Sequence, residues 1–250
     1  MDHYTLYGIN FTKMNNDYAI KRIKNSILNK KQTVVFTPNL QIIGECIKNK
    51  SLVGLLNSAD LLLPDGIGIG MLCGQKGIHG VERITGIDTA YSLLHFAAAK
   101  GLKVFLLGGK SGVAQLAAIN LRKQIPDLNI CGTHHGYFNK ENDASQNKQI
   151  LRKIQSSKPD ILFVCFGFPQ QEQWISQNCH LLPSVRLFMG LGGSLDVWAG
   201  TVRRAPHLFR FMHLEWLWRC LCQPKRIIPL TRNLFVLLTT PKNQTKKESR

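Results

Sequence analysis

The stretch KVFLLGGKSGVAQLAAINLRKQ, residues 103–124, contains a complete strand, loop and helix. Residues 103–107 are a nearly continuous apolar run, which is typical of a strand buried on both faces. Gly108 to Gly112 predict a loop, and residues 113–124 carry apolar side chains at helical spacing. The unit therefore predicts a parallel sheet that is covered by helices.

The same alternation recurs on both sides of this stretch. We expect further strands at 32–37, 59–66 (with a turn at its end), 130–138, 160–166 and 186–191. We expect further helices at 40–48, 88–100, 140–156 and 169–178, with Asp88 as an N-cap and Gly101 as the terminating glycine. The predicted class is α/β, a Rossmann-like and predominantly parallel sheet with helices on both faces.

The composition fits one domain with a short appendage. The chain has 250 residues, of which 44% are hydrophobic and 19% charged, and this excludes intrinsic disorder. Its 32 Lys and Arg against 15 Asp and Glu give a formal net charge of +17. That charge predicts an anionic partner, namely nucleic acid, an acidic membrane surface or a phosphorylated substrate.

The cysteines and the apolar segments bear on the cellular compartment. Seven cysteines without a CxxC pair, several of them in apolar runs, predict buried thiols and a reducing cytoplasm. Residues 1–4, MDHY, have no signal-peptide character, and no stretch reaches about 18 uncharged apolar residues. We expect a protein that is soluble or lies on a membrane surface.

The composition changes near residue 200. Residues 201–250 hold eleven Lys and Arg, two acids and many large apolar residues. Basic, aromatic-rich amphipathic segments are typical of membrane-surface elements, and the alternative is that these residues pack on the core. We predict an α/β core over 1–200 and a basic, helical, membrane-associating appendage with its tail over 201–250.

Glycines and polar residues follow the predicted strands. In open α/β sheets ligands bind beyond the carboxyl ends of the strands, and glycine there lets backbone N–H groups approach an anion. A nucleotide cleft is the favoured interpretation, and plain tight turns are the alternative. The residues at these ends are Thr37, Asn39, Asp65, Gly66, Gly108, Gly109, Gly136, Tyr137, Gly167, Gly192 and Gly193.

Several common catalytic motifs are missing. The sequence has no Walker A, GxGxxG, GxSxG or HExxH pattern. It also lacks the Asp-x-Asp pair with which many transferases hold a divalent metal on a diphosphate. A metal-independent site is therefore favoured, and we expect no metal and no cofactor.

Asp65 is the candidate general base, because it lies between a buried strand and Gly66. The alternative is a turn-forming or capping Asp. Arg83 lies near the helix start at Asp88, where an Arg side chain and a helix N-terminus could together bind a pyrophosphate. The alternative is a surface Arg beside a capping residue. The side-chain amides at the start of helix 169–178 could bind sugar hydroxyls. The alternative is that they form an ordinary polar first turn.

Taken together, the motifs resemble one family. In order they are 65–68 DGIG, 83–88 RITGID, 105–109 FLLGG, 136–138 GYF, 166–174 FGFPQQEQW, 190–196 GLGGSLD, 204–206 RAP, 214–219 LEWLWR and 224–226 PKR. With these motifs in family order from about 37 to 226, the chain resembles the WecB/TagA/CpsF glycosyltransferases, glycosyltransferase family 26.

The resemblance implies an inverting, metal-independent hexosyltransferase. Such enzymes move N-acetylmannosamine, N-acetylmannosaminuronic acid or another hexose from a UDP-sugar to a polyprenyl-diphosphate-linked sugar. The implied place is the inner face of the cytoplasmic membrane, where the enzyme is peripheral. The implied products are teichoic acid linkage units, enterobacterial common antigen, or capsular and exopolysaccharide repeats, and the resemblance also suggests self-association.

The resemblance also implies roles for individual residues. Asp65 would deprotonate the acceptor 4-hydroxyl, Arg83 would face the diphosphate, and Tyr137 and Asp196 would touch the uridine. Gln171 matches the Gln of the family's PKQE motif. Further substrate contacts are implied at Thr37, Asn39, Gly66, Asp88, Gly108, Gly109, Gly167, Glu172 and Gly193, and basic appendage contacts to diphosphates or membrane at Arg204, Arg219 and Arg226.

The sequence departs from the family pattern at two positions. Gln170 replaces the motif Lys, and Leu195 stands where an aromatic residue is usual. Two other classes of protein fit the sequence less well. A nucleic-acid-binding protein is disfavoured because the excess of positive charge is concentrated in residues 201–250. A Rossmann oxidoreductase or epimerase is disfavoured because the GxGxxG and Tyr-x-x-x-Lys motifs are missing.

Overall fold

The computed structural model describes residues 2–136 and 144–206, together with residues 209, 211, 212, 215 and 218. Its centre is a sheet of six strands in the order β4-β3-β8-β7-β5-β6, in which every neighbouring pair is parallel. The strands are β3 (Thr33–Phe36), β4 (Leu61–Leu62), β5 (Lys103–Gly108), β6 (Asn129–His134), β7 (Ile161–Cys165) and β8 (Leu187–Gly190). The predicted α/β class is confirmed.

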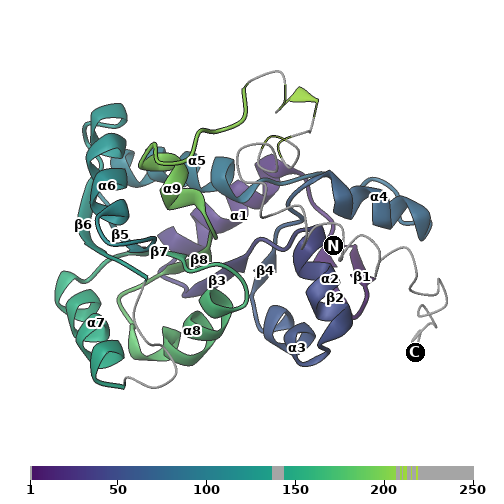
Figure 1. Ribbon diagram of the computed structural model, residues 1–250, viewed down its shortest axis with the longest axis horizontal. Coiled ribbons are helices and arrows are strands. Elements are labelled where there is room, and N and C mark those ends of the chain that lie inside the picture. Colours follow the sequence, from purple (N-terminus) through teal and green to yellow (C-terminus); the bar gives the residue numbers. More distant parts are fainter. Residues whose placement is uncertain are drawn as a thin grey trace.

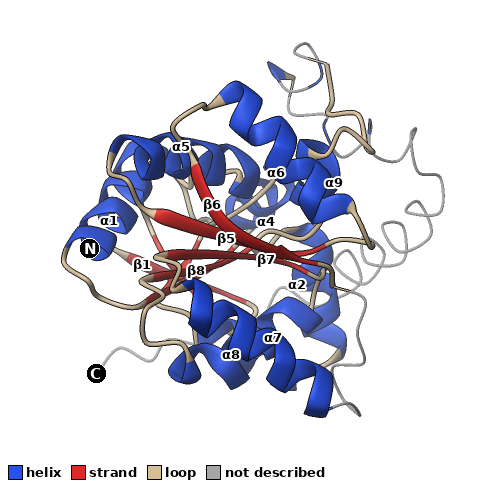
Figure 2. Ribbon diagram, turned by 90° about the vertical axis from the view of Figure 1, so that its left-hand side faces the viewer, coloured by secondary structure: helices blue, strands red, loops and turns tan. Residues whose placement is uncertain are grey.

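Helices cover both faces of the sheet (Figures 1 and 2). One face packs against α1 (Asn16–Leu28), α5 (Gly86–Ala99), α6 (Val113–Gln124) and α9 (Ser194–Trp198). The other packs against α2 (Leu40–Lys48), α3 (Ser51–Asn57), α4 (Ile67–Gln75), α7 (Ala144–Ser157), α8 (Gln170–Asn178) and a small antiparallel hairpin, β1 (His3–Leu6) with β2 (Ile9–Thr12). A short 3-10 turn, η1 (Cys179–Leu181), follows α8.

The central strands are apolar because both of their faces are covered. Every residue of β7 and β8 is buried, which explains why their sequences ILFVC and LFMG lack the polar alternation of a half-exposed strand. In the part of the chain that the structure describes, three cysteines are buried and two are half-buried, and all five are unpaired. No helix in the described ranges is long and apolar enough to cross a membrane.

Several expectations need correction. The strand expected at 59–66 is only Leu61–Leu62, because Pro64 cannot donate to a ladder and Gly66 has a positive φ of 88°. Asp88 is not the N-cap of α5, since the helix begins at Gly86 with Thr85 as its cap residue. The hairpin, α1, α3 and α4 were not predicted. Residues 137–143, on which the predicted end of β6 and start of α7 fall, lie outside the described residues.

The core predicts a large cost for truncating a central strand. Phe188 of β8 is fully buried between the two helical layers, so Phe188→Ala should lower the free energy of unfolding by about 3–5 kcal/mol. Urea denaturation followed by far-ultraviolet circular dichroism measures this. Leu116→Ala on the exposed side of α6 is the control and should cost less than about 0.5 kcal/mol. Equal losses in the two variants would contradict this packing.

Candidate active site

The predicted cleft residues meet where β3, β4 and β8 end. Thr37 follows β3, and its hydroxyl donates to the carbonyl oxygen of Gly190 in β8 at 3.1 Å. Gly86, the first residue of α5, lies so close to Thr37 that a Cβ there would come within 2.9 Å of the threonine side chain. The backbone N–H of Asp65 donates to Pro38 at 2.9 Å, so the loop after β4 is tied to the loop after β3.

Asp65 lies at the start of α5. Its Oδ2 accepts a hydrogen bond from the backbone N–H of Gly86 at 3.2 Å, and the residue is half-buried. The positive end of the α5 dipole and this N–H both favour the charged carboxylate. The structure therefore holds the Asp65 carboxyl group at a strand end, and the same hydrogen bond satisfies an N-terminal N–H of α5.

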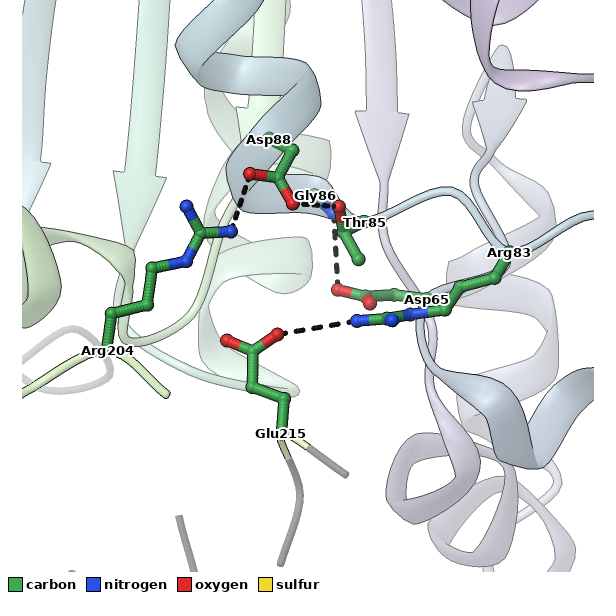
Figure 3. Close-up of polar contacts among 7 residues, drawn as sticks. All are labelled: Asp65, Arg83, Thr85, Gly86, Asp88, Arg204 and Glu215. Atoms are coloured by element: carbon green, nitrogen blue, oxygen red, sulfur yellow. Dashed lines mark hydrogen bonds and ion pairs between the residues drawn. The ribbon is translucent and has the colours of Figure 1, made fainter. Parts of the chain in front are cut away.

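Two ion pairs join the region around Asp65 to the C-terminal part of the chain (Figure 3). Arg83 pairs with Glu215 at 3.3 Å, and both side chains are largely buried. Arg204 pairs with Asp88, whose Oδ2 also accepts from the Thr85 hydroxyl at 2.6 Å. Three carboxylates and two guanidinium groups thus gather at the site. A substrate diphosphate at Arg83 would have to share or displace the Glu215 carboxylate.

A cavity opens beside Asp65. Its volume is about 290 Å³, and it is lined by Pro64, Gly66, Ile67, Gly70, Val81, Glu82 and Arg83. It combines an apolar wall with the Arg83 side chain. Another cavity, of about 240 Å³, lies along α1 and includes none of the strand-end residues.

Gln171 and Glu172 are buried on the other side of the site, where their hydrogen bonds connect two loops; we call this pair the Gln171 brace. The Gln171 side-chain oxygen accepts from the backbone N–H groups of Gly192 at 2.8 Å and Gly167 at 3.3 Å, which ties together the loops after β7 and β8. Its amide nitrogen donates to Glu172 at 2.8 Å. The polar contacts described for Gln171 are all within the chain, and contact with substrate stays a prediction for both residues.

Burial makes Glu172 an unusual acid. The residue is 1% exposed, and in the described structure its Oε2 has no hydrogen-bond partner. Desolvation raises its pKa from 4.5 to about 7, while the hydrogen bond from Gln171 opposes the shift. Burial therefore favours the neutral, protonated form of Glu172.

Several other predicted site residues cap helices or permit close packing, and some lie outside the described residues. Asn39 caps α2, accepting from Ile42 N–H at 3.1 Å, and Gly193 precedes α9, on which Asp196 is half-buried. Gly108 is required by packing, because a side chain there would overlap the Cys165 backbone, and Gly109 donates to the Cys165 carbonyl at 3.2 Å. Tyr137, Arg219 and Arg226 lie outside the described residues, as does most of the predicted appendage.

The structure adds residues that the sequence did not single out. Glu215 reaches Arg83, and Ile67 and Gly70 line the cavity. Glu215 had one signal, since it is one of only two acids in 201–250. In the described ranges no three His, Cys, Asp or Glu side chains are grouped to hold a metal ion, and metal independence of the reaction stays a prediction.

Glu172 predicts a pH-dependent stability. Its folded-state pKa is raised, so its contribution is complete below about pH 4.5 and is lost as the pH rises to about 7. One pKa unit corresponds to about 1.4 kcal/mol, so the loss is on the order of 3 kcal/mol. Glu172→Gln should gain this much relative to wild type between pH 4.5 and 7.5, measured by urea denaturation. Asp127→Asn, at an exposed carboxyl group just before β6, is the control. A Glu172→Gln difference that is constant with pH would refute the assignment.

The chain is similar to known proteins over most of its length. Residues 4–249 match the model of the glycosyl transferase WecG/TagA/CpsF family. A Bacillus spizizenii protein named N-acetylglucosaminyldiphosphoundecaprenol N-acetyl-beta-D-mannosaminyltransferase is 37% identical over 196 residues, which cover 78% of this chain and 74% of the relative. A Staphylococcus aureus protein of the same name is 32% identical over 224 residues, or 89% and 85% of the two chains. The chain therefore belongs to the WecG/TagA/CpsF family and is a glycosyltransferase.

Proposed function

We propose that this chain transfers N-acetylmannosamine, or the related N-acetylmannosaminuronic acid, from a UDP-sugar to a polyprenyl-diphosphate-linked N-acetylglucosamine. The observation that carries the proposal is the Asp65 carboxylate, held at the start of α5 beside the cavity that Arg83 lines. The acceptor class is the one in the names of the two relatives. The corresponding process is the assembly of a cell-envelope polysaccharide such as teichoic acid.

The proposed reaction is a single displacement. Asp65 accepts the proton of the acceptor 4-hydroxyl, and the resulting oxygen attacks the anomeric carbon of the donor sugar from the face opposite UDP. The new carbon–oxygen bond forms as the bond to UDP breaks, which inverts the configuration and releases UDP. Arg83 donates a charge-assisted hydrogen bond to the diphosphate of the acceptor, and this bond replaces its contact with Glu215. No step requires a metal ion.

Asp65→Asn is the direct test. The Asn oxygen still accepts from Gly86, so the fold is kept while the base is lost. With a short-chain prenyl-diphosphate-GlcNAc acceptor and a panel of UDP-sugars in EDTA, acceptor-dependent UDP release should occur with one donor. It should fall by at least about 10²-fold in the variant.

Asp127→Asn is the matched control, because Asp127 is exposed just before β6, at the opposite edge of the sheet. Undiminished activity in Asp65→Asn would assign the base to another residue. Turnover lost with EDTA and restored by a divalent ion would refute metal independence, and no turnover with any donor would refute the proposed reaction.

We further propose that the chain lies on the inner membrane surface through residues 201–250. The net charge of this segment, about +9, should draw it to anionic vesicles, and salt should release it. Co-sedimentation with phosphatidylglycerol vesicles measures this. Lys225→Gln/Arg226→Gln should weaken binding more than Lys148→Gln/Arg152→Gln, which removes two exposed charges from α7. Equal binding to phosphatidylcholine vesicles at all salt concentrations would contradict the proposal.

A further inference from the structure

Helix α4 is an apolar element at the margin of the molecule. Its sequence, IGIGMLCGQ, contains no charged residue, and Ile69, Leu72 and Cys73 are buried against the core. Figure 1 shows that α4 lies at one end of the molecule, beyond the sheet. A helix that is apolar all round is normally buried, so its position at the margin calls for an explanation.

The outward side of α4 exposes two large apolar side chains. Ile67 is 39% exposed and Met71 is 61% exposed. They are four residues apart, so they lie on the same face of the helix. A methionine on an exposed surface adapts its shape readily to an irregular apolar ligand.

The exposed face is continuous with the cavity beside Asp65. Ile67 belongs to both, and the cavity wall also includes Pro64 and Val81, while its polar end includes Glu82 and Arg83. The Glu82 carboxylate accepts a 3.5 Å hydrogen bond from the N–H of Asn16, and Arg83 pairs with Glu215. The cavity therefore leads from a guanidinium group to an apolar helix face.

Two glycines of α4 have different surroundings, and this shapes the cavity. A Cβ at Gly68 would come within 2.9 Å of Leu40, so Gly68 permits close packing on α2. A Cβ at Gly70 would meet only the carbonyl oxygen of Val81, at 4.0 Å. Gly70 thus leaves open a space that a larger side chain would fill.

We propose that this cavity and the Ile67–Met71 face of α4 bind the first isoprene units of an isoprenoid diphosphate, with the diphosphate near Arg83. The proposal rests on the proposed function, because it gives the lipid part of the acceptor a place. The chemistry fits this ligand, which has an anionic head joined directly to a branched apolar chain. The cavity is too small for a long chain, and Met71 continues the apolar path outward.

The test compares two probes that share a head group. Binding of farnesyl diphosphate and of inorganic diphosphate to the full chain is measured by isothermal titration calorimetry. We expect wild type to bind farnesyl diphosphate at least about tenfold more tightly than inorganic diphosphate. Met71→Gln and Gly70→Leu should reduce that ratio severalfold, the first by removing an apolar contact and the second by filling the cavity.

Controls keep the outcome specific. Gly70→Leu replaces a helical glycine by a better helix former, so it should fold, and thermal unfolding checks this. Leu116→Gln removes a comparable exposed apolar side chain from α6 and should leave the ratio unchanged. Equal affinities of wild type for the two probes, or an equal effect of Leu116→Gln, would overturn the proposal.

The experiment also distinguishes failure of the isoprenoid site from failure of the proposed function, and isoprenoid binding from membrane contact. Probe binding needs no turnover, so a chain that transfers no sugar would refute the proposed function while the binding ratio still decides the isoprenoid site. Variants that weaken only vesicle co-sedimentation, with the ratio unchanged, would make α4 a membrane contact and overturn the proposal.

Discussion

The site depends on the contact between the end of β4 and the start of α5. The Gly86 N–H donates to Asp65, and Gly86 approaches Thr37 so closely that a side chain would not fit. This one contact places the N-terminus of α5 over the ends of β3 and β4. Arg83 precedes it by three residues and Asp88 follows it by two, so both are carried to the same place. The position of the charged residues is thus a consequence of backbone packing.

Two ion pairs at this site join residues that lie far apart in the sequence. Arg204 reaches back to Asp88, and Glu215 reaches back to Arg83, across 116 and 132 residues. An anionic substrate that engages Arg83 would therefore disturb a contact that holds the C-terminal part of the chain to the core. A substrate contact at Arg83 would therefore compete with the Glu215 carboxylate for the same guanidinium group.

The sequence predicted helices with clear apolar spacing and missed α4, whose glycines obscure the helical pattern. The bounds of α2 and α6 were predicted correctly, because each combines helical spacing with a clear start. Helix α4 was missed because its alternating glycines, GIGIG, are typical of a loop, whereas in the structure Gly68 serves packing on Leu40. The N-cap of α5 was misplaced by three residues because Thr85 and Asp88 both have capping chemistry, and only the backbone distinguishes them.

Of the site, the sequence predicted the strand-end residues but not the contacts made across long sequence separations. Asp65 and Thr37 could be found because they follow apolar strands, and Arg83 because it lies close to a predicted helix start. Glu215 could not, since nothing local indicates that a carboxylate in a basic segment lies against Arg83. The same holds for the Gln171 brace, whose partners are backbone groups on two other loops.

The two departures from the family pattern lie at an exposed position and at a core position. Gln170 is exposed and is the first residue of α8, where the helix dipole disfavours a cation, so a neutral side chain is compatible with the helix. The neighbouring brace consists of Gln171 and Glu172, and neither bonds to Gln170 through its side chain. Leu195 is fully buried in the layer that holds Trp198, so it is a core substitution. The hydrogen bonds and the ion pair given above for Asp65, Arg83 and Gln171 involve neither the Gln170 nor the Leu195 side chain.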